Sequence, residues 1–252
     1  MGMKFAALAG LWMAATCLAA SGSSCHGAEP SEALGEVVAI DVLLHPDATM
    51  LAAAAKANAE LRGDYPAGFA LDKLHTPHIS LIQRFVRRED LPRLYRELAK
   101  VFAETPPTSL KLQAVGYYSL PVGELGLAGI VVEPTKELRG LQDRIIAAAE
   151  PFAVEGTGTA FAPSADGEAI APSIVEYVNT YVPERSGKEF NPHVTVGLGR
   201  APFVKGLIAA PFAKFTFKST GASVYHLGNF GTAAVELWSP ASETPSGAPA
   251  AK

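Results

Sequence analysis

The sequence predicts an α+β domain built from two similar halves. A five-residue phrase occurs twice, and the same order of strands and helices surrounds each copy. The copies, residues 77–81 and 192–196, both read proline, histidine, apolar, hydroxyl, apolar. Side chains alternate between the faces of a strand, so the histidine and the hydroxyl share one face, about 7 Å apart. The apolar residues point into a core, and two such strands can line one site with two imidazoles and two hydroxyls.

The first half is predicted to run strand, helix, histidine strand, helix, strand. Its strands cover residues 36–44, 76–85 and 109–120. The first of them is too densely apolar for an exposed edge. Asp47 is a good N-cap for the first helix, which ends near Gly63. Apolar residues at helical spacing place the second helix between Asp90 and Pro106.

The second half repeats this order. Its strands cover residues 125–133, 190–198 and 214–218. Thr135 caps the first helix of this half, and a short, weak helix is expected around residues 203–209. Two further strands, 223–227 and 232–238, turned at Gly228-Asn229, are expected to complete the sheet.

The spacing of the two halves indicates one insertion. The motif histidines are 115 residues apart, whereas the opening strands, at Glu36 and Gly126, are 90 apart. The remaining 25 residues lie between the helix that follows Thr135 and the second motif. Residues 155–172 are rich in Gly, Ala, Pro and Ser, so we predict a loop or lid there. As an insertion in the main domain, this loop is predicted to span residues 153–172.

The N-terminal segment is typical of a secretory signal peptide. Lys4 is its only charge before Glu29, and residues 5–20 form an alanine-rich apolar run too short for a comfortable membrane span. We therefore expect residues 1–28 to be removed and the protein to be exported, to a periplasm or to the medium. Lipid attachment at Cys25 is the less favoured alternative, because no aliphatic residue lies among the three before it. The main domain is then 33–239, followed by a disordered tail over 240–252.

Composition restricts the function. Hydrophobic residues make up 48% of the 252, enough for a substantial core. At most one cysteine remains after cleavage, which rules out an internal disulfide. The formal charge of −4 becomes −5 without Lys4, so the chain lacks the footprint for long nucleic acid, although a small nucleotide or short oligonucleotide remains open. We expect a monomer with no transmembrane span.

The sequence lacks the motifs of two other enzyme classes. Residues 186–189, Ser-Gly-Lys-Glu, have neither the preceding glycine nor the following Ser or Thr of a phosphate-binding loop. The sequence also has no Gly-x-Ser-x-Gly elbow. Nucleoside triphosphatase and serine hydrolase functions are therefore disfavoured.

Paired motifs on matched scaffolds are more informative than one His-x-Ser. Over residues 36–238 the chain resembles the 2H phosphoesterases, which include 2′-5′ RNA ligase-like proteins and cyclic nucleotide phosphodiesterases. The resemblance rests on His78-Ile79-Ser80-Leu81 and His193-Val194-Thr195-Val196. It implies a bilobal α+β fold with two antiparallel sheets related by a pseudo-twofold axis, outer helices, and motifs facing each other across a central groove. It also implies that His78 and His193 are catalytic and that Ser80 and Thr195 bind phosphate.

The residue types suit one reaction. Opening a 2′,3′-cyclic or related 2′-5′ phosphodiester needs a base for water and an acid for the leaving oxygen, and imidazole, with a pKa of about 6.5, can be either. Hydroxyls can hold the phosphate oxygens as charge develops, and no metal or other cofactor is needed. The sequence does not say which histidine is the acid.

Other side chains are weaker candidates. Arg84, Arg200 and Lys73 lie near the motifs and can neutralise phosphate, although solvated surface charge is the favoured interpretation. Core packing is likewise favoured over base stacking for four aromatic residues, Tyr117, Tyr118, Phe190 and Tyr225. A metal site at His75 and His78 is disfavoured, because their odd offset on a strand points them to opposite faces. His45 and His226 are expected at the surface or in packing.

Two alternatives to an enzyme remain at this point. The first is a non-catalytic extracytoplasmic protein that captures a nucleotide or phosphorylated ligand in the same groove. The second is a structural domain with buried histidines.

Overall fold

The computed structural model describes residues 35–163 and 167–240. The expected signal peptide and, apart from Pro240, the expected disordered tail lie outside these residues. Within the described ranges, no helix combines the length and apolar character needed to cross a membrane.

Both halves follow the predicted order of elements. The first half contains β1 (Val37–Pro46), α1 (Ala48–Asp64), β2 (Ile79–Arg87), α2 (Leu91–Glu104) and β3 (Lys111–Val122). The second half contains β4 (Leu125–Val132), α3 (Lys136–Ala149), β6 (His193–Arg200), α6 (Ala201–Ala209) and β7 (Phe215–Leu227). The remaining elements are β5 (Ala153–Val154), α4 (Pro172–Asn179), α5 (Tyr181–Arg185) and β8 (Ala233–Trp238). Single 3₁₀ turns occur at Arg88–Asp90, Pro107–Ser109, Glu150–Phe152, Gly158–Ala160, Gly187–Glu189 and Asn229–Gly231.

The helix caps follow from the sequence. Asp47 accepts hydrogen bonds from the backbone N–H groups of Thr49 and Met50, and Thr135 accepts one from Leu138. These bonds satisfy backbone donors that the first turn of a helix leaves free. Asp90 precedes α2 as predicted but makes no capping hydrogen bond with its side chain.

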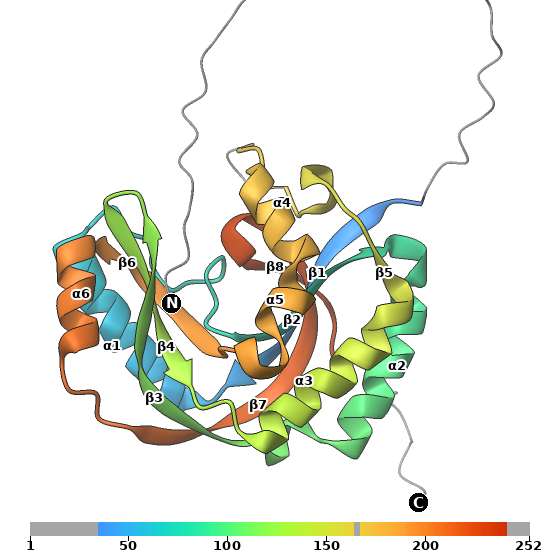
Figure 1. Ribbon diagram of the computed structural model, residues 1–252, viewed down its shortest axis with the longest axis horizontal. Helices are drawn as coiled ribbons and strands as arrows, with labels where there is room; N and C mark the ends of the chain where they lie inside the picture. Colours follow the sequence, from blue (N-terminus) through green and yellow to red (C-terminus); the bar gives the residue numbers. More distant parts are fainter. Residues whose placement is uncertain (1–34, 164–166, 241–252) are drawn as a thin grey trace, which may run out of the picture. The chain divides into compact units, whose positions relative to one another are not determined.

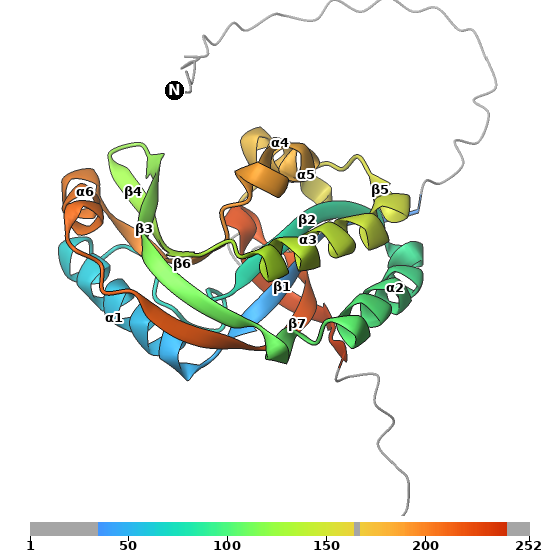
Figure 2. The same cartoon turned by 60° about the horizontal axis from the view of Figure 1, so that its bottom comes forward.

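The strands form one antiparallel sheet, so the expectation of two separate sheets is wrong (Figures 1 and 2). Its order is β5-β2-β1-β7-β3-β4-β6, with β8 paired to β7. The two predicted strands 214–218 and 223–227 are one continuous strand, β7. Its start pairs with β3 and its remainder with β1, which joins both sets of strands. The joining residues 219–222, Ser-Thr-Gly-Ala, lack the apolar alternation that marks a strand in sequence.

The two halves exchange elements. From one side the sheet reads β2-β1-β7, and from the other it reads β6-β4-β3, so each half gives its last strand to the other. The first helices are exchanged as well, since α1 packs on β6 and α3 packs on β2. Each histidine strand is therefore supported by the opposite half.

The two faces of the sheet differ. The main core lies on the face that packs against α1, α2 and α3, and its fully buried members include Ile40, Val42, Leu94, Leu141 and Val194. Burying a side chain of this size stabilises a fold by about 1.5–3 kcal/mol. The opposite face carries the motif side chains. It is partly covered by a smaller cluster that includes Ala39, Phe85, Phe161, Val178 and Leu227.

The predicted loop over residues 155–172 is correct only in part. It contains a 3₁₀ turn, and helices α4 and α5 follow it, which the sequence analysis did not predict. Both helices are short, and α5 contains Pro183, so neither has a clear helical period. They lie beside β2 (Figure 1).

Candidate active site

The two motif histidines are held in the same way. His78 directly precedes β2 and His193 begins β6. Each Nδ1 lies 2.7 Å from a backbone oxygen two residues earlier, that of Thr76 for His78 and that of Asn191 for His193. A carbonyl can only accept, so Nδ1 carries hydrogen in both rings and Nε2 is the atom available for chemistry.

His193 is in an environment that favours the neutral ring. Burial lowers the pKa of His193 to about 4, and the positive charge of His78 lowers it further, against the opposing hydrogen bond to Asn191. The two imidazoles are thus close enough to influence each other electrostatically. At neutral pH, His193 is an unprotonated base with its lone pair on Nε2.

His78 has a carboxylate beside it, which the sequence analysis missed. Asp41 of β1 is completely buried, and its Oδ2 accepts hydrogen bonds from Ser80 Oγ at 2.5 Å and from Gln83 Nε2 at 3.1 Å. His78 Nε2 lies 3.8 Å from the same oxygen. Burial raises the pKa of Asp41, whereas the charge of His78 and the two hydrogen bonds oppose that rise. An acidic residue inside a buried strand was the available signal.

An aromatic ring, that of Tyr118 in β3, lies beside His193. The Tyr118 and His193 ring centroids are 4.5 Å apart. Gly129 makes room for the phenol, because a Cβ at that position would lie 2.3 Å from Tyr118 Cε1. Thr195 hydrogen-bonds to the Tyr118 hydroxyl, and burial raises the pKa of Tyr118, so the phenol keeps its proton.

The expected phosphate binders are therefore both engaged. Ser80 gives its only hydroxyl proton to Asp41, and the Thr195 and Tyr118 hydroxyls share a hydrogen bond.

Each motif strand contains a bulge directly after the hydroxyl residue. The pairing passes from Ser80 to Ile82 and from Thr195 to Gly197, so Leu81 and Val196 have no partner in the ladder. Asn58 of α1 donates from Nδ2 to the Val196 carbonyl, 2.8 Å away.

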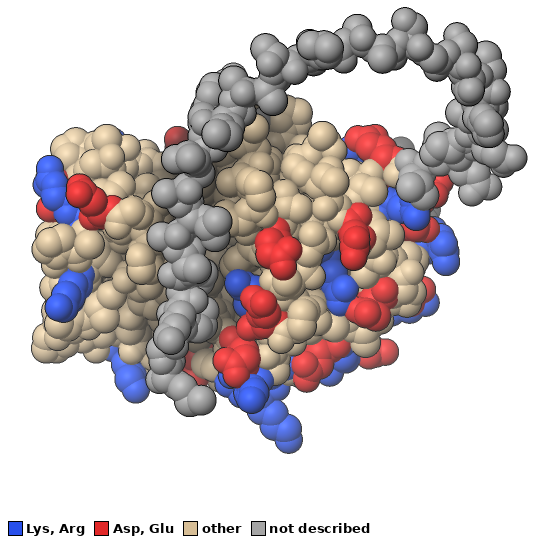
Figure 3. Space-filling view, turned by 45° about the horizontal axis from the view of Figure 1, so that its top comes forward, with Lys and Arg blue, Asp and Glu red and all other residues tan. Residues whose placement is uncertain are grey.

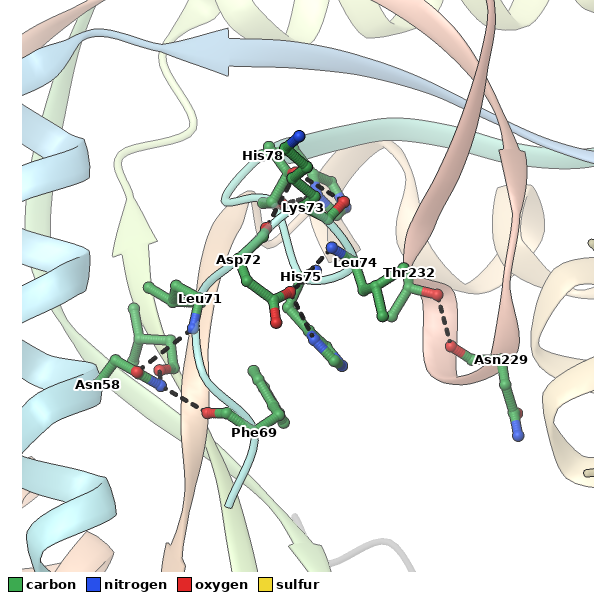
Figure 4. A network of polar contacts seen from close by, with 12 residues as sticks. Asn58, Phe69, Leu71, Asp72, Lys73, Leu74, His75, His78, Asn229 and Thr232 are labelled. Atoms are coloured by element: carbon green, nitrogen blue, oxygen red, sulfur yellow. Dashed lines mark hydrogen bonds and ion pairs between the residues drawn. The ribbon is translucent and has the colours of Figure 1, made fainter. Parts of the chain in front are cut away.

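The same amide also holds the segment that leads into the first motif (Figure 4). Asn58 Nδ2 donates to Phe69 O at 3.0 Å, and Asn58 Oδ1 accepts from the Leu71 N–H at 3.4 Å. Further along, Asp72 accepts from the backbone N–H groups of Leu74 and His75. This segment places Thr76 O against the ring of His78.

Helices α4 and α5 add two tyrosines that lie close enough to Asp41 for its charge to affect them, and an arginine that packs on one of them. The Tyr181 hydroxyl lies 3.5 Å from Ser80 O, and the Arg185 guanidinium lies 3.8 Å from the Tyr177 ring centroid. Arg185 also bonds to Glu184 and remains 30% exposed. The four-residue spacing of Tyr177, Tyr181 and Arg185 was a signal for a shared helical face.

The structure does not bring Arg84 and Arg200 to the motifs. Arg84 pairs with Ile40 in the ladder, one residue beyond the Asp41–Gln83 pair, so it points to the opposite face, where it forms an ion pair with Glu150. Arg200, at the far end of β6, bonds to Asp64.

The other candidate side chains have separate contacts. Among the aromatic residues, Phe190 is buried, Tyr117 packs on Phe212, and Tyr225 hydrogen-bonds to Glu236. Among the histidines, His75 stacks on Phe69, His45 contacts Ser223 and His226 contacts Ala160 O. The described residues include no group of three or more His, Cys, Asp or Glu arranged to hold a metal.

The model of one family, the 2′-5′ RNA ligase superfamily, matches residues 49–205, which include both motifs. The chain belongs to this superfamily, the 2H phosphoesterases. The resemblance inferred from the two motifs is thereby confirmed. No curated protein matches the sequence.

Solved structures similar to this superfamily member share little sequence with it. TT0787 of Thermus thermophilus has 16% identity and a TM-score of 0.47, over 80% of this chain and 96% of that one. Usb1 of Kluyveromyces marxianus has 10% identity and a TM-score of 0.36, over 81% and 98%. A structure of the same Usb1 with uridine monophosphate has 11% identity and a TM-score of 0.40, over 80% and 98%.

Proposed function

We propose that this 2H phosphoesterase is a phosphodiesterase that opens a 2′,3′-cyclic or related 2′-5′ nucleotide phosphodiester by acid–base catalysis with His78 and His193. The observation that supports this most directly is the matched presentation of the two rings. Each is fixed through Nδ1 by a carbonyl two residues earlier, which leaves each Nε2 available for proton transfer.

The proposed reaction needs one proton transfer at each imidazole. One Nε2 takes a proton from water as the water oxygen bonds to phosphorus. The bond from phosphorus to a ribose oxygen then breaks, and the other Nε2–H gives its proton to that oxygen. The product is a phosphomonoester with a free ribose hydroxyl, so the charge change is handled by the two rings and needs no metal.

The protein supplies further groups for a nucleotide. The Tyr118 hydroxyl, which keeps its proton and lies beside the ring of His193, can donate to a phosphate oxygen. A small ligand suits the charge of the molecule better than a long nucleic acid. On the face shown in Figure 3, acidic and basic side chains are interspersed rather than gathered into a basic field.

We also propose that the protein is exported, because its N-terminal segment resembles a signal peptide. Lys4 followed by an apolar run with small residues at its end is the composition of a cleaved signal. The enzyme would then act on nucleotides outside the cytoplasm.

The test is turnover of a panel of 2′,3′-cyclic nucleotides and 2′-5′ dinucleotides in the presence of EDTA. We expect hydrolysis by the wild type and at least about 100-fold slower turnover by His78→Ala and by His193→Ala, the usual minimum contribution of a general acid or base. His226→Ala is the matched control, because its ring contacts Ala160 O instead of the motifs. Activity that survives either motif substitution would refute the two-histidine mechanism. Nucleotide binding without any turnover would instead identify a ligand-binding protein.

A further inference from the structure

The two halves of the site differ at one pair of corresponding positions. When the two motifs are aligned on their histidines, Gln83 of β2 corresponds to Leu198 of β6. Their cross-strand partners are Asp41 in β1 and Leu127 in β4, so these two residues also correspond. The first half therefore has a carboxylate and an amide where the second half has two leucines, and the carboxylate lies beside His78.

The carboxylate is placed to act on His78. Asp41 is 0% exposed, and Ser80, Gln83 and His78 all approach the same oxygen, Oδ2. Its Oδ1 has no hydrogen-bond partner among the described residues. A buried carboxylate is costly unless an opposite charge accompanies it. A proton on His78 supplies that charge.

The other groups around the pair carry little competing charge. They are His45 from β1, His193 from β6, Tyr177 from α4, and Tyr181 and Arg185 from α5. Burial lowers the pKa of His45 and of His193 and raises the pKa of both tyrosines, so all four are neutral near pH 7. Arg185 lies against Tyr177 and pairs with Glu184. The negative charge of Glu236, in β8, partly opposes the lowering of the pKa of His45.

We propose that Asp41 is a positioning residue that holds a proton on His78, so that His78 is the general acid and His193 is the general base. This assignment rests on the proposed phosphodiesterase activity. Both rings already carry hydrogen on Nδ1, so the added proton of His78 is on Nε2, and the lone pair of His193 is also on Nε2. Each turnover moves one proton from water to His193 and one from His78 to the leaving oxygen, and exchange with solvent restores both.

The first test is the pH dependence of kcat/KM for wild type and Asp41→Asn. Asparagine keeps an acceptor for Ser80 but removes the charge. We expect the basic limb, which reports the general acid, to move to lower pH, because that acid loses the negative charge beside it. The acid limb, set by His193 and expected near pH 4, stays in place. An unmoved basic limb would overturn the assignment.

A matched control separates charge from packing. Gln83→Leu removes another hydrogen bond to Oδ2 and leaves the carboxylate charge, so we expect no comparable downward movement of the basic limb. A shift as large as that of Asp41→Asn would show that the hydrogen-bond network, not the charge, acts on His78. Asp41→Leu, which copies the residue of the second half, is expected to match Asp41→Asn.

A second readout needs no turnover. The imidazole ¹⁵N resonances of the wild type are titrated, with His78 and His193 assigned from His78→Gln and His193→Gln. We expect His78 to lose its proton at a higher pH than His193, and this order to be weakened in Asp41→Asn. A higher midpoint for His193 would overturn the assignment even if the protein cannot be shown to hydrolyse any phosphodiester. Absence of turnover with the expected NMR order would count against the proposed function alone.

Discussion

Asn58 of α1 and Gln142 of α3 make the same kind of bond in opposite halves. Each side-chain amide donates to the carbonyl of the bulged residue in the other half's motif strand, Val196 at 2.8 Å and Leu81 at 2.9 Å. A bulge leaves such a carbonyl outside the ladder, and an unpaired buried carbonyl is destabilising. The helix of one half therefore fixes the strand that carries the histidine of the other.

Each amide also reaches the segment that leads into the other motif. Asn58 donates to Phe69 O, ahead of His78, and Gln142 donates to Arg185 O at 3.3 Å, ahead of His193. One side chain thus links the end of one motif to the approach of the other. The relative position of the two histidines depends on two amides that lie outside both motifs.

Removal of either amide is expected to destabilise the fold and slow turnover. Asn58→Ala and Gln142→Ala each leave a buried carbonyl unpaired, so we expect a loss of about 1–3 kcal/mol in the free energy of unfolding. Urea denaturation followed by tryptophan fluorescence measures this. Asn179→Ala, an exposed position at the end of α4, is the control and should change stability by less than about 0.5 kcal/mol. If the amide variants are as stable as the control, the bulges are held by other contacts.

Gly129 controls the position of Tyr118. In Gly129→Ala the new Cβ would lie 2.3 Å from Tyr118 Cε1, so the ring must leave its place beside His193. We expect a loss of about 1–3 kcal/mol in stability, as for overpacked sites, and a fall in kcat. The double variant Gly129→Ala/Tyr118→Ala removes the clash. Its stability should therefore exceed the value obtained by adding the two single effects. Strict additivity would contradict the steric explanation.

Acid stability should depend on His193. Its pKa is lowered to about 4 in the folded protein, against about 6.5 in the unfolded chain, so below pH 6.5 the unfolded chain binds more protons. Stability is therefore complete above pH 6.5 and falls as the pH drops toward 4. Because part of the ring reaches solvent, we expect the wild type to lose on the order of 1 kcal/mol more than His193→Gln between pH 7 and pH 5. Equal losses in urea unfolding at the two pH values would show that His193 is not a buried neutral ring.

Local patterns in the sequence were enough for the element order and the two motifs. Alternation places His78 with Ser80, and the duplicated order makes the second motif interpretable without any knowledge of tertiary structure. How the strands of the two halves pair with each other was harder to predict from the sequence. Residues 219–222 give no strand signal of their own, so the continuity of β7, and with it the single sheet, depends on partners on both edges of the strand.

The neighbours of the histidines depend on tertiary contacts. Asp41 precedes His78 by 37 residues, and Tyr118 precedes His193 by 75. Neither has a spacing that links it to a motif. Both reach the site through cross-strand pairing, Asp41 opposite Gln83 and Tyr118 opposite Gly129. A motif alone predicts the reacting groups. Strand register determines which other side chains lie beside those groups and influence their protonation.

The Tyr118 hydroxyl is expected to contribute to catalysis separately from its ring. It shares a hydrogen bond with Thr195 and keeps its own proton, because burial raises the pKa of Tyr118. In the proposed reaction, a hydrogen bond from this hydroxyl to a phosphate oxygen would strengthen as negative charge develops. Tyr118→Phe keeps the ring beside His193 and removes that donor, so we expect kcat for a 2′,3′-cyclic nucleotide to fall about 10–100-fold, with KM nearly unchanged.

Tyr117→Phe is the natural control for this loss, since Tyr117 is the next residue on β3, faces away from Tyr118 and packs on Phe212. Its kinetics should match those of the wild type. A rise in KM with unchanged kcat in Tyr118→Phe would mean that the hydroxyl binds substrate and transition state equally. Unchanged values of both would leave the ring, rather than the hydroxyl, as the part of Tyr118 that the site uses, and the phosphate oxygens would then need a donor other than this phenol.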